Sequence, residues 1–163
     1  MEADGGGASL EWTSAPMDAP LHYGGQPRFT FTATVQAATP APMLSGTHFA
    51  VHLIDVAPDG TERIINRGYL DAQHRNTLNM SEPVPQGQPV AFSLRFFPQD
   101  DVIPAAHSIR LRLGAVDDWI QPDGSNAQVR ITIGGETGAA MTLPMVDDAT
   151  ARFFTPPSVP ATR

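Results

Sequence analysis

Several segments of this 163-residue chain alternate between apolar and polar residues. The clearest runs from Arg28 to Ala37, with four apolar residues on one face and mainly threonines on the other. The apolar four are Phe29, Phe31, Ala33 and Val35. A period of two places every second side chain on the same side of a β-strand, so this pattern predicts a half-buried strand. The same alternation predicts strands over 90–97, 108–116 and 128–133.

A β-hairpin is predicted over residues 48–70. The segment His48–Val56 is apolar on both faces, which indicates a strand near the centre of a sheet. Pro58-Asp59-Gly60 then has the composition of a tight turn, and the chain returns through Glu62–Leu70. The apolar residues between Ile64 and Ala72 also fit helical spacing, but Gly68 within them costs about 1 kcal/mol relative to Ala in a helix. The strand interpretation is therefore favoured.

Strand-breaking residues are frequent, with 16 prolines and 14 glycines. This composition argues against a helical bundle and for about eight or nine short strands joined by turns. Further short strands are predicted at 141–145 and 151–154, and residues 71–89 form a long polar connection. Two antiparallel sheets packed face to face would bury the one apolar face that each of these strands has. We expect a flexible lead-in over 1–8, a sandwich domain over 9–154 and a proline-rich tail over 155–163.

The charge and cysteine content exclude several functions. The formal net charge is −7 and every positive side chain is an arginine, so binding to a nucleic-acid backbone is not expected. The absence of cysteine excludes disulfides, thiolate-bound zinc and thiol catalysis, but does not indicate a compartment. No apolar run approaches the roughly 20 residues that span a bilayer, so no membrane partner is expected.

Nothing in the sequence predicts a catalytic centre in this chain. No serine has the Gly-x-Ser-x-Gly flanks that expose a hydrolase nucleophile on a tight turn. His48 and His52 have the spacing of zinc ligands on a helix, but on a strand they lie about 13 Å apart. The adjacent carboxylates Asp100 and Asp101 point to opposite faces if extended, as does the pair 147–148. These residues are interpreted as ordinary sheet and edge residues, and no cofactor is expected.

One loop carries the candidate binding residues. They are Asp117, Asp118, Trp119, Asp123 and Asn126. Their oxygen ligands suit calcium, although the spacing is not that of an EF-hand and a solvated acidic turn explains the same residues. Trp119 either stacks on a sugar ring or partner surface, or tucks under the rim of the sandwich. Both interpretations remain open for the tryptophan and for the carboxylates.

Several segments in order resemble a known family. The first is the run Phe49–Gly60, with Asp-Val-x-Pro-Asp-Gly at its end, followed by Gly68-Tyr-Leu and Arg75. The next are Pro85-Gln-Gly-Gln-Pro, Pro98, Ile103-Pro-Ala-Ala-His-Ser-Ile-Arg-Leu, the loop 119–122 and Thr142-Leu-Pro; Gly25-Gln-Pro stands before the first strong strand. Together they resemble the non-catalytic C-terminal domain of the X-Pro dipeptidyl-peptidase and cocaine esterase group of serine hydrolases. The chain departs from the family pattern at Ala106, where Gly is frequent, and at Ser108, where Arg is frequent.

The resemblance implies an all-β jelly-roll sandwich, similar to galactose-binding modules. It also implies a partner, an α/β-hydrolase domain that carries the Ser-Asp-His triad and on which this domain docks. The loops 71–89 and 117–126 are the expected docking segments, since loops vary without disturbing a sandwich. His107–Arg110 is interpreted as a structural turn entering a core strand. The alternatives are a free-standing carbohydrate-binding module and a purely structural or homo-oligomeric sandwich.

Overall fold

The structure is a computed structural model that describes residues 9–37, 47–115, 127–132 and 138–147. Within these ranges the chain forms ten β-strands, one 3-10 turn (η1, Ala72–His74) and no α-helix. The strands are β1 (Leu10–Thr13), β2 (Leu21–Gly25), β3 (Arg28–Ala37), β4 (His48–Val56), β5 (Glu62–Asp71), β6 (Pro89–Arg95), β7 (Gln99–Ile103), β8 (Ser108–Gly114), β9 (Ala127–Thr132) and β10 (Ala140–Thr142). None of the described ranges contains a helix with the length and hydropathy to cross a bilayer.

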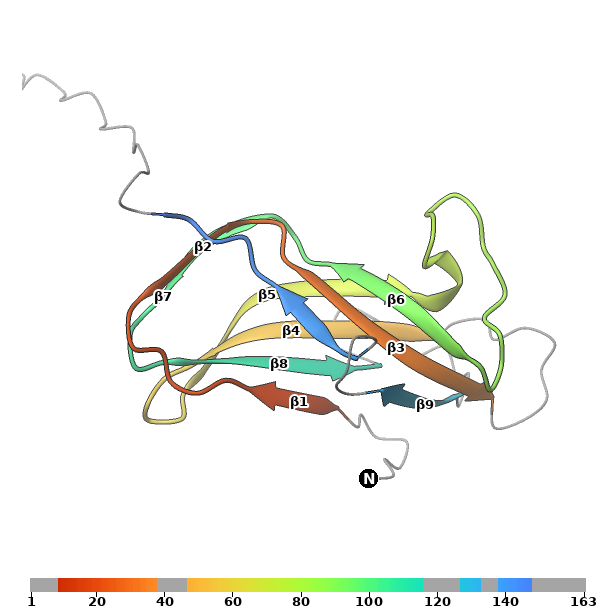
Figure 1. Cartoon of the computed structure of the whole chain (residues 1–163), viewed down its shortest axis with the longest axis horizontal. Coiled ribbons are helices and arrows are strands. Elements are labelled where there is room, and N and C mark those ends of the chain that lie inside the picture. The colour runs from red at the N-terminus through yellow and green to blue at the C-terminus, as the bar shows by residue number, and fades with distance from the viewer. Residues whose placement is uncertain (1–8, 38–46, 116–126, 133–137, 148–163) are drawn as a thin grey trace, which may run out of the picture.

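The strands form two layers and a short ribbon (Figure 1). One sheet has the order β1-β8-β4-β5. In the other, β3 pairs with β6 on one edge and with β10 and β9 in succession on the other. The paired strands β2 and β7 form the ribbon at one end. All strand pairings are antiparallel, so the predicted all-β sandwich is confirmed, as is the central position of β4. The predicted strand at 151–154, the lead-in 1–8 and the tail 155–163 lie outside the described residues.

The core lies between the two sheets and is rich in phenylalanine. Phe31 of β3 stacks on Phe29 and Phe92, with ring centroids 5.1 and 5.3 Å away. It also meets Phe49 of the opposite sheet edge-on at 4.9 Å. All four rings are at most 3% exposed, and Ala33 and Val35 are fully buried. The alternation predicted for β3 is therefore confirmed, because its apolar face is the inner face of the sandwich.

The segment that also fitted helical spacing is strand β5. Its register with β4 shifts between Leu53 and Ile54 as a β-bulge. Beyond the bulge, Gly68 forms an isolated bridge with Phe96, just past the end of β6, so β5 touches the other sheet through its backbone. A Cβ at Gly68 would lie 2.3 Å from Leu94 Cδ2. The glycine is thus required by the close approach of the two sheets.

The ribbon β2–β7 was not predicted. The sequence of β2 contains two glycines, and that of β7 begins Gln-Asp-Asp, so neither has the β-branched alternation of the other strands. The structure nevertheless buries Tyr23 and Ile103 completely under this ribbon. Two inward side chains in a five-residue strand are too weak a periodic signal to separate it from a loop.

Candidate docking site

The five predicted loop residues lie in one segment between β8 and β9. Asp117, Asp118, Trp119, Asp123 and Asn126 all lie in 116–126, outside the described residues. Calcium binding and sugar stacking by this loop therefore stay predictions.

The two histidines considered as zinc ligands lie on β4. His48 and His52 lie on one extended strand, as predicted. The Asp71 carboxylate meets His48 at 3.9 Å and His74 Nδ1 at 2.9 Å. Within the described part of the chain, no group of three or more His, Cys, Asp or Glu side chains has a geometry that could hold a metal ion.

A part-buried aspartate–histidine pair resembles two members of a catalytic triad. His107 Nδ1 lies 2.7 Å from Asp55 Oδ1, and Asp55 is 5% exposed. A triad would also place a hydroxyl on the other ring nitrogen. No such contact exists among the described residues, and Asp55 instead also accepts a hydrogen bond from Arg63 at 3.2 Å. The pair belongs to a structural network, in agreement with the structural interpretation of the His107 turn.

Arg63 links that pair to the ribbon. Its guanidinium donates to the Asp101 carboxylate at 2.9 and 3.4 Å as well as to Asp55. The hydrogen bonds that Arg63 donates to Asp101 raise the pKa of Arg63, with a smaller contribution from the bond to Asp55. Because Asp101 lies on β7 and Arg63 on β5, the network fastens the end ribbon to the main sheet.

Tyr23 of β2 is a fully buried phenol close to Arg63 and Asp101. Its hydroxyl has no hydrogen-bond partner among the described residues. Burial raises the pKa of Tyr23, and the nearby Asn66 offsets only part of this shift. The polar ends of Asn66 are engaged elsewhere, with Phe97 O and Arg67 N. The interior at this end thus keeps Tyr23 neutral.

The connection 71–89, one of the two predicted docking segments, is the feature that stands out from the sandwich (Figure 1). We call residues 72–88 the β5–β6 loop. It starts with η1, capped by Asp71 Oδ1, which accepts from Gln73 N at 2.9 Å. It ends where Gly87 N donates to Val35 O of β3 at 2.9 Å, and Val84 beside it is 4% exposed. Both ends of the loop are therefore fixed to the body.

Arg75 holds the two arms of the β5–β6 loop together. Its guanidinium donates to the carbonyl oxygens of Ala72, Glu82 and Pro83, at 3.0–3.2 Å. It also meets the Glu82 carboxylate at 3.3 Å, which accepts a second bond from Asn76 at 2.8 Å. The arginine side chain is only 11% exposed. The guanidinium of Arg75 is planar and its donors have fixed directions, so these bonds hold the loop in one conformation although it has no apolar core of its own.

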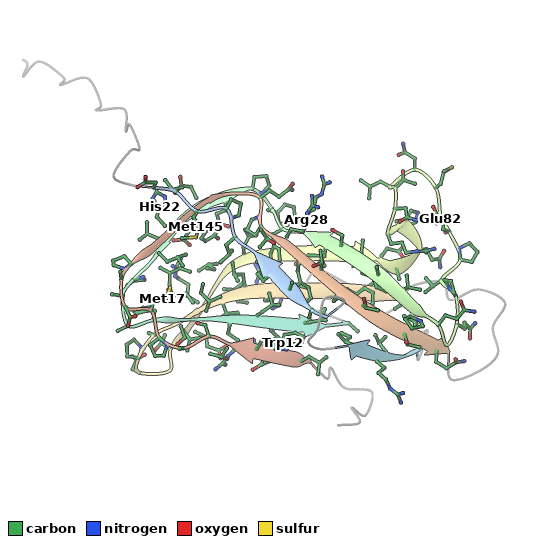
Figure 2. The ribbon with its side chains drawn as sticks, viewed as in Figure 1. Trp12, Met17, His22, Arg28, Glu82 and Met145 are labelled. Carbon is green, nitrogen blue, oxygen red and sulfur yellow. The ribbon has the colours of Figure 1, made fainter. Side chains whose placement is uncertain are left out.

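The tip of this loop carries two exposed apolar side chains. Leu78 is 87% exposed and Met80 is 64% exposed. Figure 2 places Glu82, within the loop, at the opposite end of the molecule from His22 and Met145. The connection was predicted from the sequence as a docking segment, but Leu78 and Met80 were not. Two large apolar residues inside an otherwise polar loop were the available signal.

The sequence matches one protein-family model, described as the X-Pro dipeptidyl-peptidase C-terminal non-catalytic domain, over residues 5–142. The chain belongs to this family. The resemblance to the X-Pro dipeptidyl-peptidase C-terminal domain that the sequence motifs indicated is thus confirmed. A search of curated proteins found no match.

Solved structures share the fold of this X-Pro dipeptidyl-peptidase C-terminal domain at low sequence identity. An α-amino acid ester hydrolase matches with a TM-score of 0.70 and 18% identity over 85% of this chain and 25% of that chain. An aminopeptidase from a marine sediment Thaumarchaeota archaeon gives 0.69 and 16%, over 85% and 26%. A CocE/NonD family hydrolase from Staphylococcus aureus gives 0.65 and 11%, over 86% and 30%. The chain therefore spans between a quarter and a third of the length of these proteins.

Proposed function

We propose that this domain is the non-catalytic part of a serine hydrolase, and that its β5–β6 loop docks on the α/β-hydrolase domain of the parent protein. The family it belongs to is described as non-catalytic. The structures that share its fold are named as hydrolases or an aminopeptidase, and the fold accounts for only 25–30% of each of those chains. The parent then cleaves a peptide, ester or amide acyl bond, and this domain helps to shape the cleft.

The single observation that carries the docking role is the combination of order and exposure at the loop tip. Leu78 and Met80 are exposed, yet the backbone beneath them is fixed by Arg75. Burying one such side chain contributes about 1.5–3 kcal/mol. A loop that is already ordered loses little conformational entropy on binding, so most of that free energy is available for association. Exposed apolar residues on a rigid support are typical of interface anchors.

Two experiments test whether this chain is the non-catalytic part of a serine hydrolase, one on the gene and one on the isolated chain. We expect the gene that encodes this chain also to encode an α/β-hydrolase domain with a Gly-x-Ser-x-Gly nucleophile elbow. The isolated 163-residue chain should release no product from aminoacyl-proline anilides or aminoacyl esters. A complete gene without such a domain contradicts the proposal, as does turnover by the isolated chain. Glycan binding that is lost in Trp119→Ala would instead favour the carbohydrate-binding alternative.

The docking role is tested in the parent protein. The variant Leu78→Glu/Met80→Glu places two charges at the tip, where desolvating them opposes docking. We expect kcat/KM to fall by about tenfold, a loss of about 1.4 kcal/mol in transition-state stabilisation, and the two domains to unfold in separate transitions. The matched control is Met145→Glu, a 58% exposed methionine at the other end of the domain. Equal behaviour of the two variants contradicts docking through this loop.

A further inference from the structure

The two faces of the sheet that contains β3 differ in charge as well as in burial. Phe29 and the other apolar residues of β3 face the core, so Arg28 and the threonines of the strand point outward. Arg95 of β6 is paired directly opposite Arg28, and Arg130 of β9 is opposite Thr34. Residues directly opposite each other in a sheet share a face, so all three arginines lie on the outer face. Figure 2 shows the Arg28 side chain extending away from the rest of the molecule.

The strands of this sheet carry no carboxylate that could balance these charges. β3, β6, β9 and β10 contain no Asp or Glu at any position, although the chain as a whole has a net charge of −7. We call this outer surface the arginine face. It consists of the three arginines and the outward hydroxyl residues of the same sheet, which are Thr30, Thr32, Thr34, Ser93 and Thr142.

The arginines of this face are unpaired within the described residues. Arg28, Arg95 and Arg130 are exposed, and none of them makes an ion pair or a side-chain hydrogen bond with another described residue. Most other described arginines bind carboxylates; these are Arg63, Arg75, Arg110 and Arg112. Like charges placed directly opposite each other, as in the Arg28–Arg95 pair, lower the stability of a sheet. The arginine face is therefore not explained by the stability of the sandwich, and it is available for an anionic partner.

The arginine face has no apolar anchor for a protein partner. Of the large apolar side chains exposed in the described structure, only Val129 is on a strand of this sheet, and it is paired with Val35 on the inner face. Stable protein interfaces usually have an apolar centre that is rich in aromatic residues. A second copy packed face to face by twofold symmetry would also bring arginines against arginines. A partner of this face must therefore be anionic and bind through polar contacts.

Hydroxyl groups form a line between the arginines. Thr30, Thr32 and Thr34 alternate along β3, about 7 Å apart. About 20 Å of strand separates Arg28 from Thr34, the residue opposite Arg130. The Thr30 hydroxyl makes one long contact with a carbonyl oxygen of β10, at 3.5 Å, whereas those of Thr32 and Thr34 make no hydrogen bond with a described residue. The outward positions of these strands hold no aromatic ring on which nucleic-acid bases or neutral sugars could stack.

We propose that the arginine face binds a linear acidic polysaccharide, a chain that contains uronic acid units, along strand β3. The carboxylate of one unit binds the Arg28–Arg95 pair, and that of a unit farther along binds Arg130. Planar guanidinium groups bind carboxylates through two parallel bonds, and threonine hydroxyls both donate to and accept from sugar hydroxyls. The proposal does not depend on the proposed function, and it assigns sugar binding to a surface other than the loop that contains Trp119.

The affinity of the full 163-residue chain for polygalacturonate tests the proposal, by isothermal titration calorimetry at low salt. Arg28→Gln/Arg95→Gln should weaken binding at least about tenfold, because it removes two charged hydrogen-bonding groups. It should not lower Tm, since the two arginines repel each other. The matched control is Arg110→Gln/Arg112→Gln, which removes the same charge from the outer face of the other sheet and should bind like the original chain.

A second pair of measurements separates sugar recognition from charge alone. Thr32→Val keeps the shape of the side chain and removes only the hydroxyl, so it should weaken binding about threefold. Polyglutamate has carboxylates but no sugar hydroxyls, and it should bind more weakly than polygalacturonate. Added salt should weaken the binding of both polymers, because it screens exposed charges.

Equal affinities of the two arginine variants overturn the proposal, as does a lack of binding to polygalacturonate at low salt. Polyglutamate that binds as tightly as polygalacturonate also overturns it, because the face would then recognise carboxylates on any carrier, such as an acidic protein. An unchanged affinity in Thr32→Val contradicts the placement of the polysaccharide along β3. Binding that survives Arg28→Gln/Arg95→Gln but is lost in Trp119→Ala overturns the proposal as well, and assigns the sugar site to the loop instead.

Discussion

The sandwich body and the β5–β6 loop are ordered by different forces. In the body, Phe31 and its neighbours are almost fully buried and dispersion contacts hold them in place. In the loop, one arginine binds three carbonyl oxygens and a carboxylate, while the largest apolar residues point into solvent. A segment can thus be well defined without a core, and its apolar residues are then free for a partner.

The largest loss of stability is expected from a substitution in the core of the body. Phe31→Ala should lower the free energy of unfolding by about 3–5 kcal/mol, because it leaves a cavity among three other rings. Urea unfolding measures it. Phe97→Ala is the control, since Phe97 is 54% exposed, and it should cost less than about 1 kcal/mol. Similar losses for the two variants would mean that the core does not dominate stability.

The contact between the sheets should be nearly as sensitive. Gly68→Ala places a Cβ against Leu94 and should cost about 2–3 kcal/mol through overpacking. Combining it with Leu94→Ala should cost less than the sum of the single losses, since the two side chains compete for one space. Additive losses in this double-mutant cycle would contradict the close approach.

The loop should respond locally rather than globally. Arg75→Lys removes the fork that reaches several carbonyl oxygens, and should cost about 1–2 kcal/mol. Amide exchange at Glu82, whose N–H donates to Gln73 O, should accelerate more than at residues of β3. Arg95→Lys, on the exposed side of β6, is the control. Uniform acceleration across loop and body would remove the distinction between the two regions.

The body should also lose stability at high pH through Tyr23. Its pKa is raised in the folded state, so the stabilisation is complete below the ordinary tyrosine pKa and is lost as pH rises through the folded value. Stability should therefore fall as pH rises above 10, and Tyr23→Phe should remove this part of the fall. The chain has no lysine or cysteine, so few other groups titrate there. An unchanged pH profile in the variant would contradict this account.

The smallest expected change stabilises the body. Ala106 has φ of 65°, a conformation that L-residues adopt at a cost, in the turn closed by His107 N and Pro104 O. Ala106→Gly should raise the free energy of unfolding by about 0.5–1 kcal/mol, since relief of strain exceeds the added entropy of the unfolded chain. Thermal unfolding measures the gain. A lower Tm in the variant would show that the turn is not strained.

Strands with a clear alternation of apolar and polar residues were predicted from the sequence, whereas features without such a pattern were missed. The alternation of β3 supported the predicted sandwich because it marks a strand with one buried face, and the turn after β4 marked the hairpin with β5. The family pattern marked Ala106 as a departure from glycine, and its positive φ explains why glycine is frequent there. Leu78 and Met80 stood out in the sequence only as large apolar residues in a mainly polar loop, because their exposure depends on how Arg75 folds the loop back on itself. The ribbon β2–β7 has too few inward residues to be recognised.

The backbone bridge between Gly68 and Phe96 has a mechanical consequence. It joins the layers at one point, and the β5–β6 loop joins them again farther along the same two strands. The layers therefore cannot slide past one another without breaking main-chain hydrogen bonds. A force applied at the loop tip would therefore act on both sheets, and the two sheets would move together instead of sliding past each other.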